Sequence, residues 1–502
     1  MSNYVISIGG SGSRSVEALV HMCAAGLGPK DLNIIFVDPD KSNGNLTKAQ
    51  EVLVEYMNTR KMLVDNGIKL GEGDFYYTDF GNTTENHWGI FTKDNNTLEK
   101  FINFSTLSEI EKDFIKTLYS TDELQTQLDE GFRGHPSIGA LVMSLVDFEQ
   151  EPWKSFWNSV ISLSTERSTK VFIFGSIFGG TGAAGLPTIA KIIKGHKDIG
   201  LADGKSKVDL GGTLLLPYFT FELPKQGTKG LFVTVNDFPL AAKAALKFYG
   251  SEDTGFDDIY LLGEITENSL GEFSTGTQSQ KNKSHYVELL AAFSSLDFFH
   301  TLKPPTDTKK RVFLSARNDN DQIRWEEIPY SREANTRFHH QKVFGSVEEF
   351  TTFLYVKEKF FNDVVLEELK KSTNYRAPWY KNTFDTEINL TKDNGIHPKV
   401  SEALRQLIKY RNLYQRWVSE ISENKGKVSV RLFNVMEQKE HWDKDTVGRL
   451  LTDRRTKKKI HFLDDMTTIS DQKEFQNQVK SVKEPFFRLY SLTKQSTHKF
   501  LG

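Results

Sequence analysis

Cysteine is almost absent from this sequence. Cys23 is the only one among 502 residues, so no disulfide can form within the chain. Disulfides are rare in the reducing cytoplasm, and this composition therefore favours a cytoplasmic protein. The amino-terminal residues also lack a basic segment followed by an apolar stretch, which is the pattern of a secretory signal.

Long apolar runs and an excess of charge of one sign are also missing. No run approaches the roughly 18 apolar residues of a membrane span, and the formal net charge is only −2. A chain without a basic field is not drawn to nucleic acid or to an anionic membrane. We interpret the local basic run at 454–459 as a solvated helix face. We therefore expect no membrane span and no nucleic-acid partner.

The residues that are abundant indicate a globular protein. Hydrophobic residues make up 38% of the chain and charged residues 26%, and 37 residues are Phe. This balance is typical of a chain that buries a sizeable core, and 502 residues allow two or three domains.

The first 40 residues predict a strand, a helix and a second strand. Residues 4–8 form an apolar run, and residues 14–25 carry apolar side chains at helical spacing. A second apolar run, residues 32–37, ends on Asp38-Pro39-Asp40. Such a unit builds parallel sheets, so the sequence predicts a doubly wound α/β fold.

The alternation continues along the chain. Further predicted helices cover 46–64, 138–163, 186–193 and 240–249, further strands cover 170–176, 212–216 and 258–262, and 71–97 is interpreted as an insertion or loop. A helix at 285–299 is apolar on most sides, as expected of a helix buried between two domains. The second half predicts one strand, 311–314, and long charged helices at 347–369 and 401–421.

These patterns divide the chain into three parts. We predict an α/β domain with a parallel sheet at 1–282, a central helix at 283–300, and a carboxyl-terminal domain at 301–502. The last part is predicted to be α+β or mostly helical. It carries no motif that indicates a chemistry.

The first candidate site is the glycine loop Gly9-Gly10-Ser11-Gly12-Ser13, between the first strand and its helix. Small residues let backbone N–H groups approach an anion, and the helix dipole favours negative charge there. The segment is also a near miss of the dinucleotide fingerprint. A purely structural turn is a third interpretation.

A second glycine loop, residues 178–185, again stands between a strand and a helix. It resembles the tubulin signature loop, which in FtsZ-like proteins reads G-G-G-T-G-T-G followed by a small-residue pair and proline. The matching residues are Gly179, Gly180, Thr181, Gly182 and Pro187, whereas Phe178 and Ala184 replace glycines. Ala183 completes the predicted phosphate loop. Pro187 is expected near the helix start, where its missing N–H costs little.

Three further segments match the tubulin/FtsZ family in the same order. Residues 131–139 are similar to the FtsZ loop G-x-G-x-x-P-x-x-G by the γ-phosphate, which implies contacts from Arg133 and Gly134; an exposed turn arginine is the alternative. Residues 217–222 resemble the ribose loop P-F-x-F-E, which assigns Phe219 and Glu222. Asp38 and Asp40 occupy the place of the second nucleotide loop, unless they only form an Asp-Pro turn.

Base recognition is harder to assign. Glu264 stands where the family has an asparagine, and Asn282 and Tyr286 open the predicted central helix. An aromatic ring and an amide can stack on and pair with a purine. His285 lies between them and is equally well explained as a buried, hydrogen-bonded residue.

The acidic motif that supports hydrolysis in this family, N-x-D-x-x-D/E after the central helix, is not visible. Asp297 and Asp307 are the catalytic candidates by position, although neither has the expected neighbours. A buried or capping aspartate explains either one equally well.

The resemblance covers roughly residues 1–300 and implies a function. It implies a divergent tubulin/FtsZ-like protein that binds GTP or GDP, with Mg²⁺ held through the phosphates and no protein metal site. It also implies head-to-tail self-assembly into cytoskeletal filaments and slow GTPase activity at subunit junctions.

Two other functions stay open. The missing acidic motif favours a non-polymerising nucleotide-dependent module that acts with a companion protein. The first glycine loop and Asp38 fit an NAD(P)-dependent oxidoreductase, which leaves the second loop unexplained. A Walker-type ATPase is disfavoured because neither loop ends in Gly-Lys-Ser/Thr.

Overall fold

The fold is described from a computed structural model of the chain. The described residues are 3–40, 42–81, 86–89, 97–128, 132, 135–162, 168–199, 206–222, 237–264, 268–272, 282–301, 311–314, 322–328, 340–359, 377–384, 390–392, 395–423, 429–433, 446–447, 460–480, 482 and 484–501. Within them, no helix is long and apolar enough to cross a bilayer.

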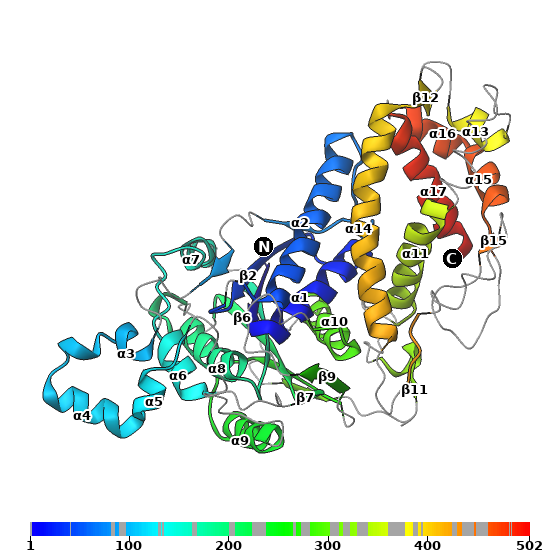
Figure 1. Ribbon diagram of the computed structural model, residues 1–502. Coiled ribbons are helices and arrows are strands. Elements are labelled where there is room, and N and C mark those ends of the chain that lie inside the picture. The colour runs from blue at the N-terminus through cyan, green and yellow to red at the C-terminus, as the bar shows by residue number, and fades with distance from the viewer. Residues whose placement is uncertain are drawn as a thin grey trace.

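A parallel sheet forms the centre of the amino-terminal half (Figure 1). Its strands, in spatial order, are β10 (Arg311–Leu314), β8 (Asp258–Leu262), β6 (Val208–Leu215), β5 (Thr169–Ser176), β1 (Asn3–Ile8), β2 (Asp31–Val37) and β3 (Asp79–Phe80), and β4 (His87–Trp88) also pairs with β2. Every pairing in this sheet is parallel. The chain order reverses between β1 and β5, and α/β sheets bind ligands at such a switch point. The predicted α/β class is confirmed.

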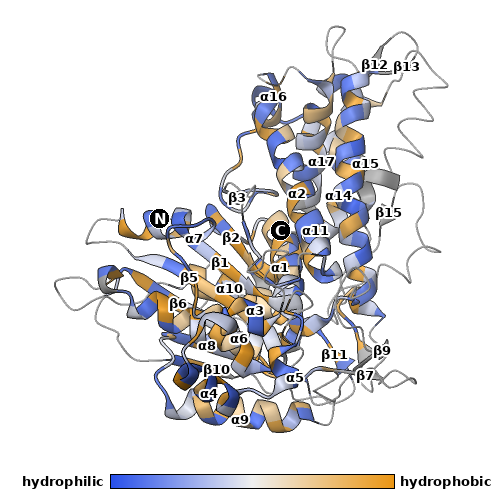
Figure 2. Cartoon of the chain, turned by 60° about the vertical axis from the view of Figure 1, so that its left-hand side comes forward, coloured by the Kyte–Doolittle hydropathy of each residue, from blue (hydrophilic) through white to orange (hydrophobic). Residues whose placement is uncertain are grey.

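Helices cover both faces of the sheet because the strand side chains alternate between two cores. Val5 and Phe172 belong to the core under α1 (Gly9–Ala24), α2 (Gly44–Asp65) and α10 (Tyr286–His300). Ile6 and Ile173 belong to the opposite core, under α6 (Pro136–Met143), α7 (Trp153–Ile161), α8 (Gly180–Gly195) and α9 (Phe238–Ser251). The strands are accordingly coloured as hydrophobic in Figure 2. Strands buried on both faces read as continuous apolar runs, which is why the sequence predicted them well.

Both glycine helices begin earlier than expected. We predicted helices from residues 14 and 186, but α1 begins at Gly9 and α8 at Gly180. The glycines belong to the first turns, and Gly12 and Gly182 lie too close to the sheet backbone to carry a side chain. Pro187 therefore lies inside α8 rather than near its start.

The helical stretch predicted at 138–163 is two helices. α6 ends at Met143 and α7 begins at Trp153, directly after Pro152. Proline disfavours a helical conformation in the residue before it, so Pro152 limits how far α7 can extend toward α6. A lobe that the sequence did not predict precedes them: α3 (Leu98–Phe101), a 3₁₀ turn (Phe104–Thr106), α4 (Glu109–Leu118) and α5 (Thr121–Leu124).

The carboxyl-terminal half is mostly helical, as predicted. Its principal helices are α11 (His340–Lys359), α13 (Pro378–Thr383), α14 (Pro398–Ser422), α15 (Phe462–Ser470), α16 (Lys473–Lys480) and α17 (Pro485–Leu501). Its strands are the two-residue β11 (Gln322–Ile323), β12 (Thr391–Lys392), β13 (Gly395–Ile396), β14 (Ser429–Val430), β15 (Thr446–Val447) and β16 (Ile460–His461), and a 3₁₀ turn covers Trp325–Glu327. The predicted helix at 401–421 lies within α14. Of the helix predicted at 347–369, residues 360–369 lie outside the described residues.

The two halves share one hydrophobic cluster. α14 runs beside α2 (Figure 1), and Tyr410 of α14 packs against Tyr56 of α2 and Tyr76. The Nδ1 atom of the buried His21 in α1 lies 3.0 Å from the Tyr410 hydroxyl. The division at residues 283–300 stays a prediction, since the core continues across it.

Candidate functional site

The two glycine helices start side by side at the carboxyl edge of the sheet. β1 and β5 are neighbours, so the helices that follow them, α1 and α8, begin at adjacent points. A Cβ placed on Gly9 would lie 3.2 Å from the Thr181 Cβ, and Gly9 has a φ of +69°. Only glycine adopts this conformation without strain. The structure therefore brings the two predicted phosphate loops together.

The starts of α1 and α8 carry unneutralised positive dipole ends. In the described part of the chain, neither start receives a side-chain cap, and neither first turn contains an acidic residue. By contrast, α4 and α10 are closed by capping boxes, formed by Ser108 with Glu111 and by His285 with Glu288. The first N–H groups of an uncapped helix need a partner, and an anion is the partner that the dipole favours.

Two more glycines bring these helices onto the sheet. A Cβ on Gly12 would lie 2.9 Å from the Phe174 carbonyl oxygen, and one on Gly182 would lie 2.4 Å from the Ser176 carbonyl oxygen. Both distances are shorter than a carbon–oxygen contact allows. Gly12 and Gly182 therefore allow α1 and α8 to pack closely against the backbone of β5. The half-buried residues Gly10, Ser11, Gly179, Gly180, Thr181 and Ala183 form the accessible part of the two turns.

The start of α2 is a third wall of the site, and sequence reasoning missed it. Asn43 caps α2 by accepting the Asn45 backbone N–H at 2.9 Å. The Asn45 Nδ2 atom lies 3.1 Å from a Cβ placed on Gly10, and its Oδ1 atom accepts the Asn282 backbone N–H at 2.9 Å. Asn45 thus joins the first glycine turn to the predicted base-binding segment. The Asn-Gly-Asn sequence at 43–45 is a helix-start signal that could have indicated it.

A buried ion pair lies directly behind the first glycine turn. The Arg14 Nε atom lies 2.6 Å from Glu288 Oε1, and both side chains are almost fully buried. Tyr218 accepts a hydrogen bond from Arg14 Nη2 at 2.6 Å and donates one to Glu288 Oε1 at 2.8 Å. Ser11 also hydrogen-bonds Tyr218. Burial raises the pKa of Glu288.

A second buried cluster connects the site to α14. Lys48 of α2 lies 3.2 Å from Glu17 of α1 and pairs with Glu420 of α14. Ser284, just before α10, donates its backbone N–H to Glu420 at 2.8 Å and receives a hydrogen bond from Lys48 at 2.9 Å. Burial raises the pKa of Glu17. The cluster holds four helices at fixed positions around the predicted nucleotide loops.

Phe219, the predicted ribose-loop residue, is part of an aromatic group beside the second glycine turn. It opens β7 (Phe219–Glu222), which pairs with β9 (Asn268–Glu272). The centroid of its ring lies 5.4 Å from the ring centroid of Phe178 and 5.0 Å from that of Tyr218. The backbone of Glu222 is described, whereas its side chain lies outside the described residues.

Asp38 and Asp40 form a buried turn at the carboxyl end of β2. Asp38 Oδ1 accepts the Asp40 N–H at 3.1 Å, and Asp40 Oδ1 accepts the N–H and hydroxyl of Ser42 at 2.9 and 2.7 Å. Burial raises the pKa of Asp38 to about 7. The turn lies at the same edge of the sheet as the glycine helices. Its contact with a nucleotide stays a prediction.

The predicted base-binding residues surround the start of α10. The Asn282 backbone is fixed by Asn45, as described above, and Tyr286 is 4% exposed. His285 is also buried, and burial lowers its pKa to about 3, so the imidazole is neutral at pH 7 and caps α10. Glu264 is half-buried, two residues beyond β8. Their roles stay predictions.

Of the two catalytic candidates, the structure describes one. Asp297 lies near the carboxyl end of α10, away from the glycine turns, and accepts a hydrogen bond from the Tyr260 hydroxyl at 2.8 Å. Burial raises its pKa. Asp307, Arg133 and Gly134 lie outside the described residues.

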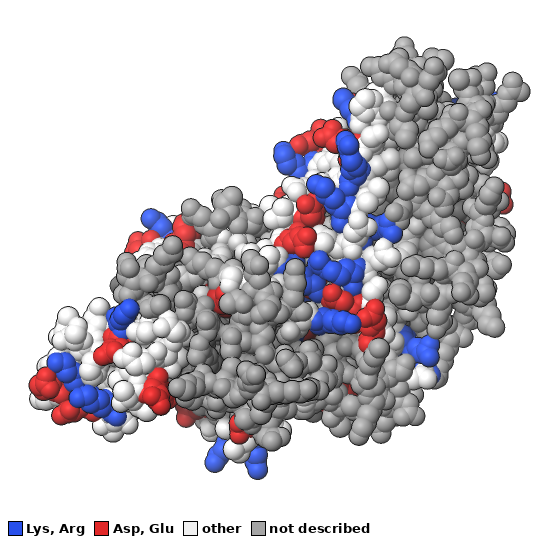
Figure 3. Space-filling model, in the orientation of Figure 1, with Lys and Arg blue, Asp and Glu red and all other residues white. Residues whose placement is uncertain are grey.

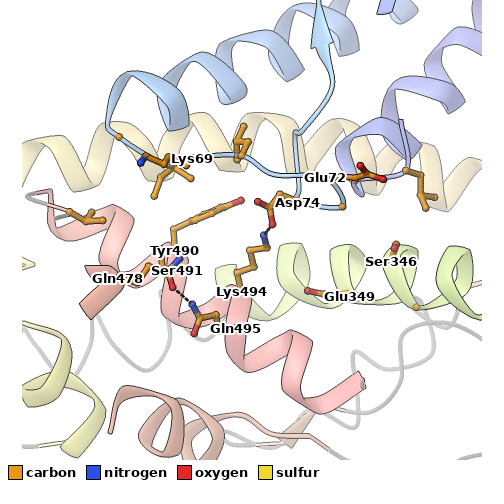
Figure 4. Close-up of a pocket in the computed structure, with 18 of the residues that line it drawn as sticks. Lys69, Glu72, Asp74, Ser346, Glu349, Gln478, Tyr490, Ser491, Lys494 and Gln495 are labelled. Atoms are coloured by element: carbon orange, nitrogen blue, oxygen red, sulfur yellow. Dashed lines mark hydrogen bonds and ion pairs between the residues drawn. The ribbon is translucent and has the colours of Figure 1, made fainter. Parts of the chain in front are cut away.

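A large pocket lies away from the glycine turns, beyond the carboxyl ends of α1 and α2. Its volume is about 990 Å³. In Figure 4, Lys494 of α17 points to Asp74, with which it forms an ion pair, and Tyr490 lies beside them. None of the predicted nucleotide residues lines this pocket. No group of three or more His, Cys, Asp or Glu among the described residues is placed to hold a metal ion.

Comparisons with solved structures give several weak likenesses, which include two CetZ proteins. CetZ2 from Haloferax volcanii, solved as a GTPγS-bound protofilament, is 15% identical over 60% of this chain and 60% of its own, with a TM-score of 0.28. CetZ from Methanosaeta thermophila strain DSM 6194 is 12% identical over 60% of this chain and 52% of its own, with a TM-score of 0.24. The chain thus spans less than two thirds of either protein, and TM-scores this low carry no argument. No protein-family profile and no curated protein matches the sequence.

Proposed function

We propose that this chain is a divergent tubulin/FtsZ-like protein that binds a guanine nucleotide at the starts of α1, α2 and α8. The observation that carries the proposal is the convergence of α1 and α8, both uncapped, at the switch point of a parallel sheet. Two positive helix ends beside each other favour a polyanion over a single charge.

The residues at this position fit a nucleotide phosphate chain. Gly9 and Thr181 approach each other so closely that a side chain on Gly9 would fill the space between the turns. We propose that the phosphates accept hydrogen bonds from the backbone N–H groups of Gly10, Ser11, Gly180 and Thr181. Mg²⁺ held through the phosphates would neutralise their charge. The Asn45 amide, beside Gly10, is placed to orient the sugar or the phosphates.

Guanine specificity is proposed to come from the segment at the start of α10. Asn282 and Tyr286 are the proposed base-contacting residues, since Asn45 holds the Asn282 backbone close to the first glycine turn. The ordered matches of four loops to the tubulin/FtsZ family favour guanine over nicotinamide dinucleotides. The second glycine helix also supports this choice, because a dinucleotide-binding unit needs only one.

Calorimetry with purified, nucleotide-stripped protein tests the proposal. We expect GTPγS and GDP to bind with one site per chain, and ATPγS and NAD⁺ to bind at least ~10-fold more weakly, a difference of about 1.4 kcal/mol. Nucleotide released from freshly purified protein and identified by chromatography gives an independent measurement. Absence of both binding and co-purified nucleotide would overturn the proposal, and NAD⁺ binding would support an oxidoreductase.

We further propose that the chain assembles head to tail in the cytoplasm. The glycine turns lie at one edge of the sheet and Asp297 lies toward the other, so stacking two copies would bring the two features together. GTP-dependent pelleting and electron microscopy test this. Protein that stays monomeric with GTP at high concentration would contradict assembly without affecting the binding proposal.

One observation favours a second function, a nucleotide-dependent module that does not polymerise. Asp297 is engaged by Tyr260 within its own subunit, so it is not a free acid for a neighbouring copy. GTP turnover measured against protein concentration separates the two functions. A shared site makes specific activity rise with concentration, and a solitary site leaves it constant.

A further inference from the structure

The lobe beside the nucleotide domain exposes an apolar ridge on α4. Ile110, Phe114 and Leu118, each four residues apart, are 83%, 63% and 54% exposed. No residue of α4 is buried. Residues four apart share one helix face, so the three side chains form a continuous ridge. Apolar residues of this size are rarely left exposed in a row unless another surface covers them.

The helix that carries this ridge is well formed. The capping box of Ser108 and Glu111 closes its start. The lobe is also attached to α6, because the Glu123 carboxylate lies 3.1 Å from Nδ1 of His135, the cap residue of that helix. The ridge is therefore part of a defined surface.

A second ridge with the same spacing lies on α9. Leu240 and Phe248 are 69% and 37% exposed, and Ala244 between them is also exposed. Its opposite face is buried through Phe238, Ala242 and Tyr249. The ridge thus faces outward from the nucleotide domain. The α9 ridge is smaller than that of α4, because an alanine lies at its centre and Phe248 is less exposed than Phe114.

The two ridges have flanks of opposite charge. The exposed acids Asp113 and Glu111 flank the ridge of α4, whereas Lys112 and Lys116 lie on the other side of that helix. The exposed Lys243 and Lys247 flank the ridge of α9, and Lys191 Nζ lies 5.1 Å from the Phe248 ring centroid. Figure 3 shows charges of both signs on the lobe and basic side chains at the lower margin, where α9 lies.

We propose that the α4 ridge of one copy packs on the α9 ridge of a second copy of this chain. Among the described residues, both ridges keep exposed apolar side chains, and in Figure 1 α4 and α9 lie apart, at the left and the lower centre. Rows of side chains four residues apart interdigitate in the commonest class of helix packing. Opposite charges beside the ridges select this pairing over α4 with α4 or α9 with α9.

This contact lies outside the proposed nucleotide site and does not require a nucleotide. A stable protein–protein interface buries about 1,200–2,000 Å² of accessible surface. A contact between two short helices buries less than this. We therefore expect weak association, in the micromolar range or above, that adds to any nucleotide-dependent assembly. Because the contact forms without nucleotide, its failure and the failure of the proposed function can be distinguished.

Sedimentation velocity of the nucleotide-stripped full chain over a concentration series tests the pairing. The weight-average sedimentation coefficient of the wild type should rise with concentration. Phe114→Glu should weaken association at least ~10-fold, as expected for a central aromatic residue of an interface. Glu109→Lys is the matched control, because it changes charge on the other side of the same helix and should leave association within about 2-fold.

Charge exchange gives a second, sharper test. Asp113→Lys alone and the double variant Lys243→Glu/Lys247→Glu alone should each associate more weakly than the wild type. An equimolar mixture of the two should regain association, because each α4 flank again meets an opposite charge. A wild type that stays monomeric at every concentration, ridge variants that associate like the wild type, or a mixture that does not recover would each overturn the proposal.

Discussion

Arg14 of α1 and Glu288 of α10 form an ion pair whose atoms Nε and Oε1 are 2.6 Å apart, with side-chain exposures of 2% and 0%. The pair joins the first glycine helix to the central helix directly behind the proposed phosphate site. Removing one partner of a buried pair leaves the other charge without compensation. The position of the glycine turn therefore depends on both charges.

The first prediction concerns the stability of this pair. Glu288→Gln should lower the free energy of unfolding by about 3–5 kcal/mol, because it leaves the Arg14 guanidinium buried and unpaired. Urea unfolding followed by circular dichroism measures the effect. The control is Glu423→Gln, which breaks the exposed pair of Glu423 with Lys283 at 2.8 Å. That change should cost less than about 1 kcal/mol. Equal losses in both variants would contradict the assigned role of the buried pair.

The second prediction concerns Gly9. Gly9→Ala should reduce GTPγS affinity at least ~10-fold, or by about 1.4 kcal/mol, because the added Cβ lies 3.2 Å from Thr181 and the φ of +69° is strained for alanine. Calorimetry measures the affinity. Gly67→Ala is the matched control, since Gly67 has a φ of +86° with no atom within 4 Å of its Cβ position.

The Gly67 control separates strain from binding. Both substitutions should cost about 1–2 kcal/mol of stability through the left-handed backbone, but only Gly9→Ala should change nucleotide affinity. Unchanged affinity in Gly9→Ala would remove the first glycine turn from the proposed site.

The third prediction concerns Asn45, which the sequence did not single out. Asn45→Asp keeps the oxygen that accepts the Asn282 N–H but places a negative charge beside Gly10. GTPγS affinity should fall about 10–100-fold, and the loss should shrink at high salt because screening weakens charge repulsion. Asn45→Ala, which loses the hydrogen bond without adding charge, should have a smaller, less salt-dependent effect.

A charge control lies at the other end of the same helix. Asn66, the C-cap residue of α2, hydrogen-bonds the Met62 carbonyl oxygen through its side chain. Asn66→Asp makes the same chemical change far from the glycine turns and should leave affinity unchanged. If both asparagine-to-aspartate variants bind GTPγS equally well, α2 does not form part of the site.

The sequence was informative where one local signal determines the structure. The strands at 258–262 and 311–314 agree with the structure residue for residue, because each is a short run made mostly of apolar residues. This holds even for the edge strand β10, in which Val312 is 58% exposed. The glycine loops were also recognised from a local signal, a cluster of glycines between an apolar strand and a helix. Their inclusion in α1 and α8 was missed, since glycine lowers helix propensity and only close packing on the sheet explains its presence.

Features made by contacts distant in sequence could not be predicted. Tyr218 was noticed only as part of a loop, yet its hydroxyl links Arg14 to Glu288. Lys48 and Glu420 are 372 positions apart, and no periodicity connects them. The lobe of α3 to α5 was missed although α4 carries two sequence signals of a helix. These are the capping box of Ser108 and Glu111 and the apolar residues spaced four apart.

The last prediction is a pH dependence from Asp38. Burial raises the pKa of this carboxyl from 3.8 to about 7 in the folded chain, so between pH 4 and 7 the folded state binds more protons than the unfolded state. Its contribution to stability therefore falls as pH rises through that range. Asp38→Asn can still accept the Asp40 N–H but cannot ionise. Relative to the wild type, this variant should gain stability as pH increases and level off above pH 7.

Urea unfolding of the nucleotide-stripped protein at pH 5 and pH 8 measures this effect. The stability of Asp38→Asn minus that of the wild type should be larger at pH 8, by on the order of 2 kcal/mol. Glu17 and Glu288 are also buried with raised pKa values, but they are present in both proteins. Their contributions to the pH dependence of stability therefore cancel in the comparison. An equal difference at the two pH values would mean that Asp38 has an ordinary pKa and that the turn after β2 is open to solvent. In that case its charge would repel the phosphates, and Asp38→Asn would bind GTPγS more tightly at pH 8.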